Sequence, residues 1–211
     1  MTAGQYVKLF YMRDAAVIWL HGLGADRSDF EPIVPELHLP PSVKFVFPDA
    51  PVRAVTINGG MRMRAWYDIL QFGPGPEDEA GIRESQRAIE QLIEAQPVPP
   101  ERVVLAGFSQ GGAIVLHTAL RYPKKLAGVI ALSTYVPLRE KMPEASPANH
   151  EIPIFMGHGQ YDDIIPISRA QASRDLLLKA GYRVDWREYP MPHSVCMEEI
   201  TDIGAFLADL L

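Results

Sequence analysis

Short apolar runs alternate with longer amphipathic stretches along this chain of 211 residues, and this alternation restricts its fold more than any other feature. A continuous aliphatic and β-branched run is typical of a strand buried on both faces, as in a parallel sheet covered by helices. Residues 183–189 alternate polar and apolar side chains, which predicts a strand nearer the sheet edge. The predicted buried strands are residues 17–20, 43–47, 102–106, 128–132 and 152–156.

The stretches between these runs have helical periodicity. Ile82, Ile89 and Ile93 recur at helical spacing, and Gly181 stands where a C-terminal cap belongs. The predicted helices are residues 79–96, 109–122, 168–180 and 198–211. Strands that alternate with helices predict an α/β fold, with a mainly parallel sheet and helices on both faces. We expect a single domain over residues 1–211.

Two long segments, residues 48–81 and 135–151, do not fit this alternation. Loops of this length inside a compact domain are uncommon, and they are usually functional covers or binding loops. Neither segment contains a long apolar helix, so we expect no large lid domain.

Composition excludes several classes of function. Acidic residues outnumber basic ones by 26 to 20, so no nucleic-acid partner is expected. The single cysteine, Cys196, rules out an internal disulfide and a zinc site built on several thiolates, and we expect it to be a small packed thiol. Apolar runs are far shorter than the roughly 20 residues of a spanning helix, and residues 1–10 lack a signal-peptide pattern. We expect a cytoplasmic protein without stable membrane insertion.

Residues 107–111, Gly-Phe-Ser-Gln-Gly, lie between a predicted strand and a predicted helix. In this context the G-x-S-x-G pattern predicts a nucleophile elbow, a sharp turn that raises the serine hydroxyl above the strand end. The hydroxyl also lies near the positive end of the following helix. Ser109 is therefore the candidate nucleophile. The alternative is a glycine-rich packing turn with an incidental serine.

A serine nucleophile needs a base, and the base needs a carboxylate that orients it. With a nucleophile elbow the chain order is Ser, then acid, then His. His193 follows the last predicted strand across a short turn and is the candidate base. Asp162 and Asp163 both follow residues 152–156, and their spacing does not choose between them.

An oxyanion formed at Ser109 needs backbone donors that are held in place in advance. One donor is expected at Gln110, directly after the nucleophile. The second is expected at Leu23, which lies between two glycines in the loop after the first strand. This loop shows no phosphate-binding pattern. His21 and His158, at strand ends before glycines, are expected to orient loops by hydrogen bonds.

Several motifs resemble those of one family. They are His-Gly-Leu-Gly-Ala-Asp (21–26), Phe-Pro-Asp-Ala-Pro (47–51), Arg-Ala-Trp-Tyr-Asp (64–68), Gly-Phe-Ser-Gln-Gly-Gly (107–112), His-Gly-Gln-Tyr-Asp (158–162) and Tyr-Pro-Met-Pro-His (189–193). Over residues 15–211 the chain resembles the small carboxylesterase/acyl-protein thioesterase (phospholipase/carboxylesterase) family of α/β-hydrolases, and bacterial carboxylesterases most closely. The resemblance implies an α/β-hydrolase fold.

The resemblance also implies roles for individual residues. Asp162 would complete the triad with Ser109 and His193, Leu23 and Gln110 would bind the oxyanion, and Trp66 would line the acyl-side cleft. Apolar surface for an acyl chain is expected from residues 48–81, at Met61, Met63, Trp66, Tyr67 and Phe72.

The predicted function is a serine carboxylesterase or acyl thioesterase that cleaves short- to medium-chain acyl esters through an acyl-enzyme. No cofactor and no metal are expected. The substrate would be a small acyl ester or an acylated protein. The sequence does not decide whether the protein forms a homodimer. Alternatives are a lysophospholipase with the same triad, or a non-catalytic binding protein with this fold. The second alternative predicts a missing triad member, and none is missing.

Overall fold

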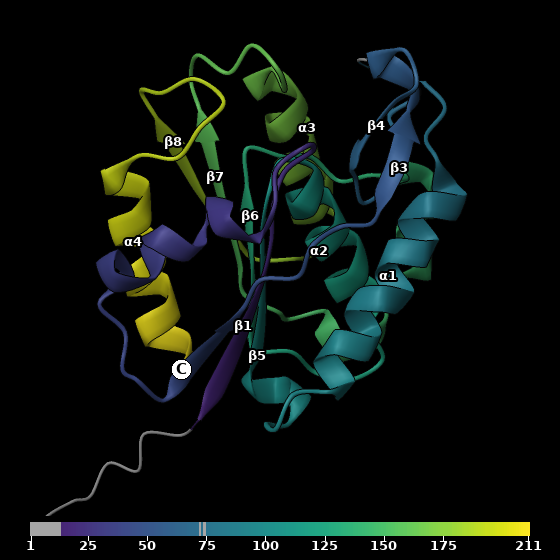
Figure 1. Ribbon diagram of the computed structural model, residues 1–211. Coiled ribbons are helices and arrows are strands. Elements are labelled where there is room, and N and C mark those ends of the chain that lie inside the picture. Colours follow the sequence, from purple (N-terminus) through teal and green to yellow (C-terminus); the bar gives the residue numbers. More distant parts are fainter. Residues whose placement is uncertain (1–13, 72, 74) are drawn as a thin grey trace, which may run out of the picture.

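The computed structural model describes residues 14–71, 73 and 75–211, so the predictions on residues 1–10 and on Phe72 lie outside it. A six-stranded sheet has the order β2-β1-β5-β6-β7-β8 (Figure 1). Neighbouring strands of this sheet pair in parallel, which confirms the predicted parallel sheet. Its strands are β1 (Ala15–Leu20), β2 (Val43–Val46), β5 (Val103–Phe108), β6 (Gly128–Leu132), β7 (Ile154–Gly159) and β8 (Val184–Tyr189).

Helices cover both faces of the sheet (Figure 1). They are α1 (Glu79–Glu94), α2 (Gln110–Arg121), α3 (Ile167–Lys179) and α4 (Met197–Leu210). Helices α1 to α3 pack on one face, and α4 packs on the other with the short 3-10 helix Glu31–Leu37. Strand β1 is buried on both sides: Ile18 contributes to the first core and Trp19 to the second. This explains its uninterrupted apolar sequence.

Strand β7 differs from the predicted strand at residues 152–156, because it runs from Ile154 to Gly159. Pro153 has no N–H to donate to a sheet, so the strand begins after it. Gly157 and Gly159 extend the strand beyond its predicted end, and neighbouring groups approach both of them closely. A Cβ at Gly159 would lie 2.3 Å from the carbonyl oxygen of Pro192.

Residues 48–81 contain a hairpin that the sequence analysis missed. Strands β3 (Val52–Val55) and β4 (Met61–Arg64) pair antiparallel as a separate two-stranded sheet. Gly59 and Gly60 have positive φ in the connection, a conformation that glycine adopts without steric cost. Each strand has only four residues, so the alternation of apolar and basic side chains in Met61–Arg64 is too brief to predict a strand.

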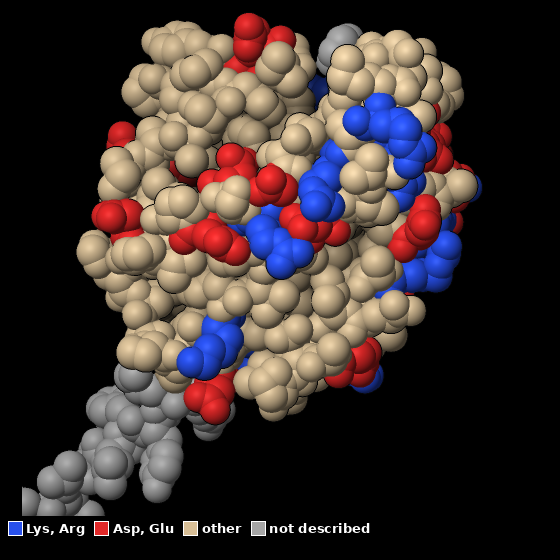
Figure 2. All heavy atoms as spheres, in the orientation of Figure 1, with Lys and Arg blue, Asp and Glu red and all other residues tan. Residues whose placement is uncertain are grey.

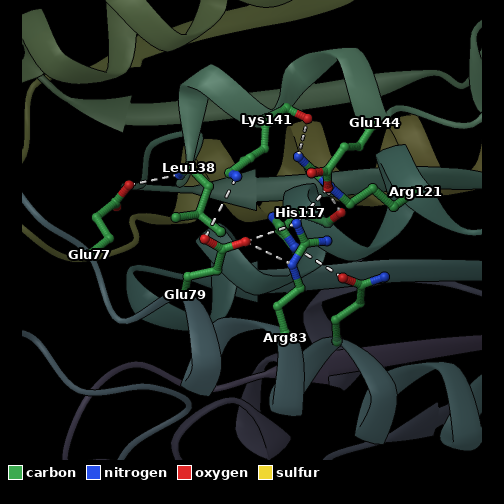
Figure 3. A network of polar contacts seen from close by, with 9 residues as sticks. Glu77, Glu79, Arg83, His117, Arg121, Leu138, Lys141 and Glu144 are labelled. Carbon is green, nitrogen blue, oxygen red and sulfur yellow. Dashed lines mark hydrogen bonds and ion pairs between the residues drawn. The ribbon is translucent and has the colours of Figure 1, made fainter.

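Residues 135–151 are held against α1 and α2 by a polar network (Figure 3). The guanidinium of Arg121, at the end of α2, donates to the carbonyls of His117 and Lys141 at 3.2 and 2.7 Å. Arg83 of α1 forms an ion pair with Glu144 at 2.5 Å. The segment is therefore fixed to the helical layer, and it forms no large lid.

The predicted edge position of β8 is confirmed, since β8 pairs only with β7 among the described strands. Asp185 and Arg187 are exposed on β8 and form an ion pair at 2.8 Å.

The surface carries charges of both signs. On the face shown in Figure 2, Lys and Arg side chains lie among Asp and Glu and do not merge into one continuous basic area. Within the described residues, no helix combines the length and the apolar character needed to cross a membrane.

One carboxyl group, that of Glu199 in α4, is buried without a hydrogen-bond partner among the described residues. A Cβ at Gly157 would lie 2.1 Å from its Oε1 atom, so the side chain packs directly on β7. Desolvation, with a smaller contribution from Asp202, raises the pKa of Glu199 to about 8. The folded protein therefore holds a proton that the unfolded chain loses near pH 4.5.

This proton makes folding stability depend on pH. Between pH 4.5 and about 8 the folded state binds more protons than the unfolded state, so stability falls as pH rises. We expect Glu199→Gln, which resembles the neutral acid, to stabilise the fold by about 3 kcal/mol at pH 7 and by little at pH 4.5. Urea unfolding at several pH values measures this difference. A stability difference that does not vary with pH would contradict it.

Candidate active site

Ser109 lies in the turn between β5 and α2. Its backbone has φ 54° and ψ −118°, a conformation that costs a non-glycine residue about 1–3 kcal/mol. Neighbouring groups hold the turn: the Ser109 amide donates to the carbonyl of Leu132 at 2.8 Å, and the Thr134 hydroxyl donates to the Ser109 carbonyl at 2.7 Å. The predicted strand–turn–helix context of Ser109 is therefore present.

The glycines around Ser109 allow three backbone segments to meet. A Cβ at Gly107 would lie 2.5 Å from the carbonyl carbon of Gly111. A Cβ at Gly111 would lie 2.5 Å from the carbonyl oxygen of Leu20 and 2.6 Å from that of His21. Without side chains at these positions, α2 begins directly against the end of β1.

His193 lies beyond the end of β8 and contacts both Ser109 and Asp162. Its Nε2 atom is 2.9 Å from the Ser109 hydroxyl oxygen, and its Nδ1 atom is 2.7 Å from Oδ2 of Asp162. The side chain is 15% exposed, and the Phe108 ring packs 4.7 Å from the imidazole, centroid to centroid. The structure thus brings the predicted nucleophile, base and acid into one hydrogen-bonded chain.

Asp162 and Asp163, which the sequence spacing left undecided, have different environments. The Asp162 carboxylate is fully buried, and its Oδ1 atom accepts the amides of Ile164 and Ile165 at 3.0 and 2.8 Å. Burial alone would raise the pKa of Asp162, but hydrogen bonds from His193 and from these amides outweigh it, so this pKa lies below its usual value. Asp163 is exposed and lines a different cavity.

His158 supports the Asp162 loop, as expected from its position at a strand end. Its Nε2 atom is 2.8 Å from the carbonyl oxygen of Ile165 and 3.3 Å from Oδ2 of Asp162. Burial lowers the pKa of His158, so at neutral pH the ring is an uncharged donor. The ring stacks on Trp186 with centroids 6.2 Å apart.

Leu23 and Gln110, the predicted oxyanion donors, both line the cavity that contains Ser109. A Cβ at Gly22 would lie 3.5 Å from the Cβ of Ser109, so the loop of Leu23 passes directly beside the nucleophile. The His21 ring orients this loop: its Nδ1 donates to the carbonyl of Gly22 at 2.7 Å, and its Nε2 accepts the Ala50 amide at 3.0 Å. Burial lowers the pKa of His21, consistent with this neutral form.

The cavity above Ser109 and His193 has a volume of about 390 Å³ and a largely apolar wall. Its apolar lining includes Leu23, Ala25, Ile57, Tyr67, Ile69, Phe108, Ile164 and Ile165. A larger cavity of about 830 Å³ shares Tyr135, Ile164 and Arg169 with it, and Arg139, Glu77, Glu140 and Asp163 give that cavity charge.

Trp66, predicted to line the acyl-side cleft, does not line the cavity of Ser109. It is 3% exposed, and its indole Nε1 donates to the carbonyl of His21 at 2.9 Å. That prediction is therefore wrong: the ring packs in the core beneath the loop. Met61 and Met63 do not line this cavity either, whereas Tyr67 does.

Two other predictions concern groups outside the triad. Cys196 is half-buried directly before α4 and lines none of the cavities described above. Within the described part of the chain, no group of three or more His, Cys, Asp or Glu side chains is placed to hold a metal ion.

Comparisons with known proteins identify the family of this chain. Residues 12–211 match the phospholipase/carboxylesterase family. Acyl-protein thioesterase 1 of Mycosarcoma maydis is 39% identical, over 93% of this chain and 91% of that protein. The crystal structure of Arabidopsis thaliana SOBER1 superposes with a TM-score of 0.88 at 30% identity, covering 93% of this chain and 98% of that one. That of Zea mays acyl-protein thioesterase 2 gives 0.86 at 28% identity, covering 93% and 94%.

These solved structures confirm the α/β-hydrolase fold without a large lid. The relatives match this chain over nearly its whole length, and so does the family pattern. The chain is therefore a carboxylic ester hydrolase that belongs to the phospholipase/carboxylesterase family.

Proposed function

We propose that this protein hydrolyses acyl esters and acyl thioesters through Ser109, His193 and Asp162. The observation that carries the proposal is the continuous hydrogen-bonded chain from the Ser109 hydroxyl to His193 and on to Asp162, with contacts of 2.9 and 2.7 Å. This chain lies at an apolar cavity that is open to a substrate.

The first half of the reaction acylates the serine. His193 Nε2 takes the hydroxyl proton while Ser109 Oγ attacks the acyl carbon. Asp162 holds the Nδ1 proton of His193 and stabilises the imidazolium that forms. The negative charge on the carbonyl oxygen is bound by the backbone amides of Gln110 and Leu23. The imidazolium then protonates the departing alcohol or thiol, and the acyl group stays on Ser109.

The second half returns the enzyme to its starting state. Water replaces the leaving group, and His193 removes one of its protons as the oxygen attacks the acyl-enzyme. The second tetrahedral intermediate uses the same amides and breaks down when His193 returns the proton to Ser109 Oγ. The products are a carboxylic acid and an alcohol or thiol.

The two adjoining cavities suit different parts of the substrate, the acyl chain and the leaving group. The apolar walls above Ser109 suit an acyl chain, since each buried CH₂ contributes about 0.8 kcal/mol. The charged cavity beyond Arg169 suits a polar leaving group. Relatives named acyl-protein thioesterase support an acylated protein as one substrate, beside small acyl esters.

A second candidate function is that of a lysophospholipase, in which the same triad cleaves the acyl ester of a lysophospholipid. The observation that favours it is the pair Arg139 and Arg169 in the wall of the larger cavity, where a phosphodiester could be bound by a guanidinium.

Ser109→Ala tests the nucleophile. We expect turnover of a chromogenic ester to fall by about a million-fold, as when the catalytic serine of subtilisin, a protease of unrelated fold, is lost. Labelling by a fluorophosphonate, which reacts with the activated hydroxyl, should also disappear. Circular dichroism should show an intact fold. Labelling of the variant at the rate of the wild type would overturn the assignment.

Asp162→Asn and Asp163→Asn form a matched pair that tests the acid. An asparagine at 162 favours the wrong His193 tautomer, so kcat should drop roughly 10⁴-fold. Asp163 is exposed and Asp162 is the carboxylate hydrogen-bonded to His193, so Asp163→Asn should stay within a few-fold of the wild type. The ratio of the two kcat values is the measurement. Equal losses, or a larger loss for Asp163→Asn, would exclude Asp162 as the acid.

Chain-length preference tests the acyl cavity. Values of kcat/KM for esters with C2 to C12 acyl groups should rise as methylenes are buried, and fall once the cavity of about 390 Å³ is full. Acyl thioesters should follow the same profile, and emulsified long-chain triglyceride should be a poor substrate. A lysophospholipid that is hydrolysed faster than every neutral ester would favour the second candidate. A profile without a maximum would contradict the bounded cavity.

A further inference from the structure

We propose that Trp66 is a positioning residue for the oxyanion site: it fixes the loop of Leu23 relative to the start of α2, where Gln110 lies. This proposal rests on the hydrolase function above, in which the amides of Leu23 and Gln110 bind the oxyanion. Trp66 does not touch the substrate cavity, but it contacts both segments that supply these amides.

The first link joins Trp66 to the loop of Leu23. The indole Nε1–H donates to the carbonyl of His21 at 2.9 Å, and the two rings pack with centroids 5.4 Å apart. The His21 carbonyl belongs to the peptide bond between His21 and Gly22. The Leu23 amide belongs to the next peptide bond, between Gly22 and Leu23. The indole therefore restrains the orientation of the loop as it leaves β1.

The second link joins the same residue to α2. The Trp66 backbone amide donates to Oε1 of Gln110 at 2.8 Å, and Nε2 of Gln110 donates to the carbonyl of Tyr67 at 2.8 Å. The Gln110 side chain is thus held at both ends of its amide, and the residue is 2% exposed. On the opposite side, the Ser85 hydroxyl of α1 donates to the Trp66 carbonyl.

These contacts form a series: the Leu23 loop, then Trp66, then Gln110. An oxyanion donor acts only when it lies about 2.7–3.1 Å from the developing charge, and losing one donor costs about 10²–10³-fold in kcat. A misplacement of about 1 Å costs on the order of 10²-fold. Because each link is buried, where a hydrogen bond is electrostatically stronger than in water, the series can hold both amides within this tolerance.

Trp19 separates this role from that of an ordinary core tryptophan. It is equally buried, at 1% exposure, but it belongs to the core on the other face of the sheet. Its Nε1 has no hydrogen-bond partner among the described residues. Trp19→Phe therefore makes the same chemical change as Trp66→Phe, but it removes no hydrogen bond to the loop of Leu23.

Trp66→Phe is the central test, since phenylalanine keeps an aromatic ring and the backbone bond to Gln110 but lacks the indole donor. We expect kcat to fall by about 10- to 100-fold for every ester from C2 to C8, with KM and chain-length preference unchanged. Inhibition by an aliphatic trifluoromethyl ketone, whose adduct with Ser109 carries an oxyanion, should weaken by the same factor. Trp19→Phe should stay within a few-fold of the wild type.

Gln110→Met tests the second link, because it removes the side-chain bonds and keeps the backbone amide. It should lower kcat to a similar extent, and it provides the test if Trp66→Phe does not fold. Two links in one series are not independent, so the double variant should lose little more than the worse single variant. Losses that multiply would overturn the series.

Other outcomes distinguish this inference from the proposed function. A wild-type protein that neither hydrolyses esters nor reacts with a fluorophosphonate would refute the proposed function itself. If the wild type is active, an unchanged kcat in folded Trp66→Phe would refute the positioning role. If Trp66→Phe loses its chain-length preference but hydrolyses acetyl esters at the normal rate, Trp66 lines the acyl cleft and the positioning role is refuted. If kcat falls as much in Trp19→Phe as in Trp66→Phe, the effect comes from core packing and the positioning role is refuted.

Discussion

The close approach of α2 to the end of β1 is the constraint on which the site depends. It requires a backbone without side chains at Gly107 and Gly111, and it leaves Ser109 in a conformation that serine rarely adopts. Bonds to Leu132 and Thr134 offset this local cost, so the strain is held by the surrounding sheet. The same approach brings the loop of Gly22 beside the serine. One packing event therefore creates both the exposed hydroxyl and its neighbouring backbone donors.

Most of the parallel sheet and two members of the hydrogen-bonded chain could be predicted from local sequence. Buried parallel strands have uninterrupted apolar runs, and a serine between a strand and a helix is a local signal. His193 followed from chain order together with its place just after the last predicted strand. The choice between Asp162 and Asp163 could not follow from spacing, because it depends on which carboxylate receives the amides of Ile164 and Ile165. Only the family resemblance selected Asp162 in advance.

Two of the errors have a common physical origin, since they involve contacts between residues that are distant in the sequence. The family resemblance placed Trp66 in the acyl-side cleft, but its indole N–H donates to the carbonyl of His21, directly after the end of β1. The predicted strand ended at Met156, but β7 continues through Gly157 and Gly159, and the first of these glycines accommodates Glu199. The β3–β4 hairpin has strands too short for a periodic signal. Tertiary packing therefore decided the first two cases, and strand length the third.

The two outer strands of the sheet also affect how copies of this protein behave at high concentration. An unpaired strand edge exposes backbone donors and acceptors that another chain can join, which is a route to aggregation. Strand β8 carries the exposed pair Asp185 and Arg187, and β2 is only four residues long with Lys44 exposed. Charges on an edge would have to lose water before a second sheet could add there. These charges therefore disfavour edge-to-edge pairing between two copies of the protein. They leave the carboxyl end of the sheet, where Ser109 lies, accessible to substrate.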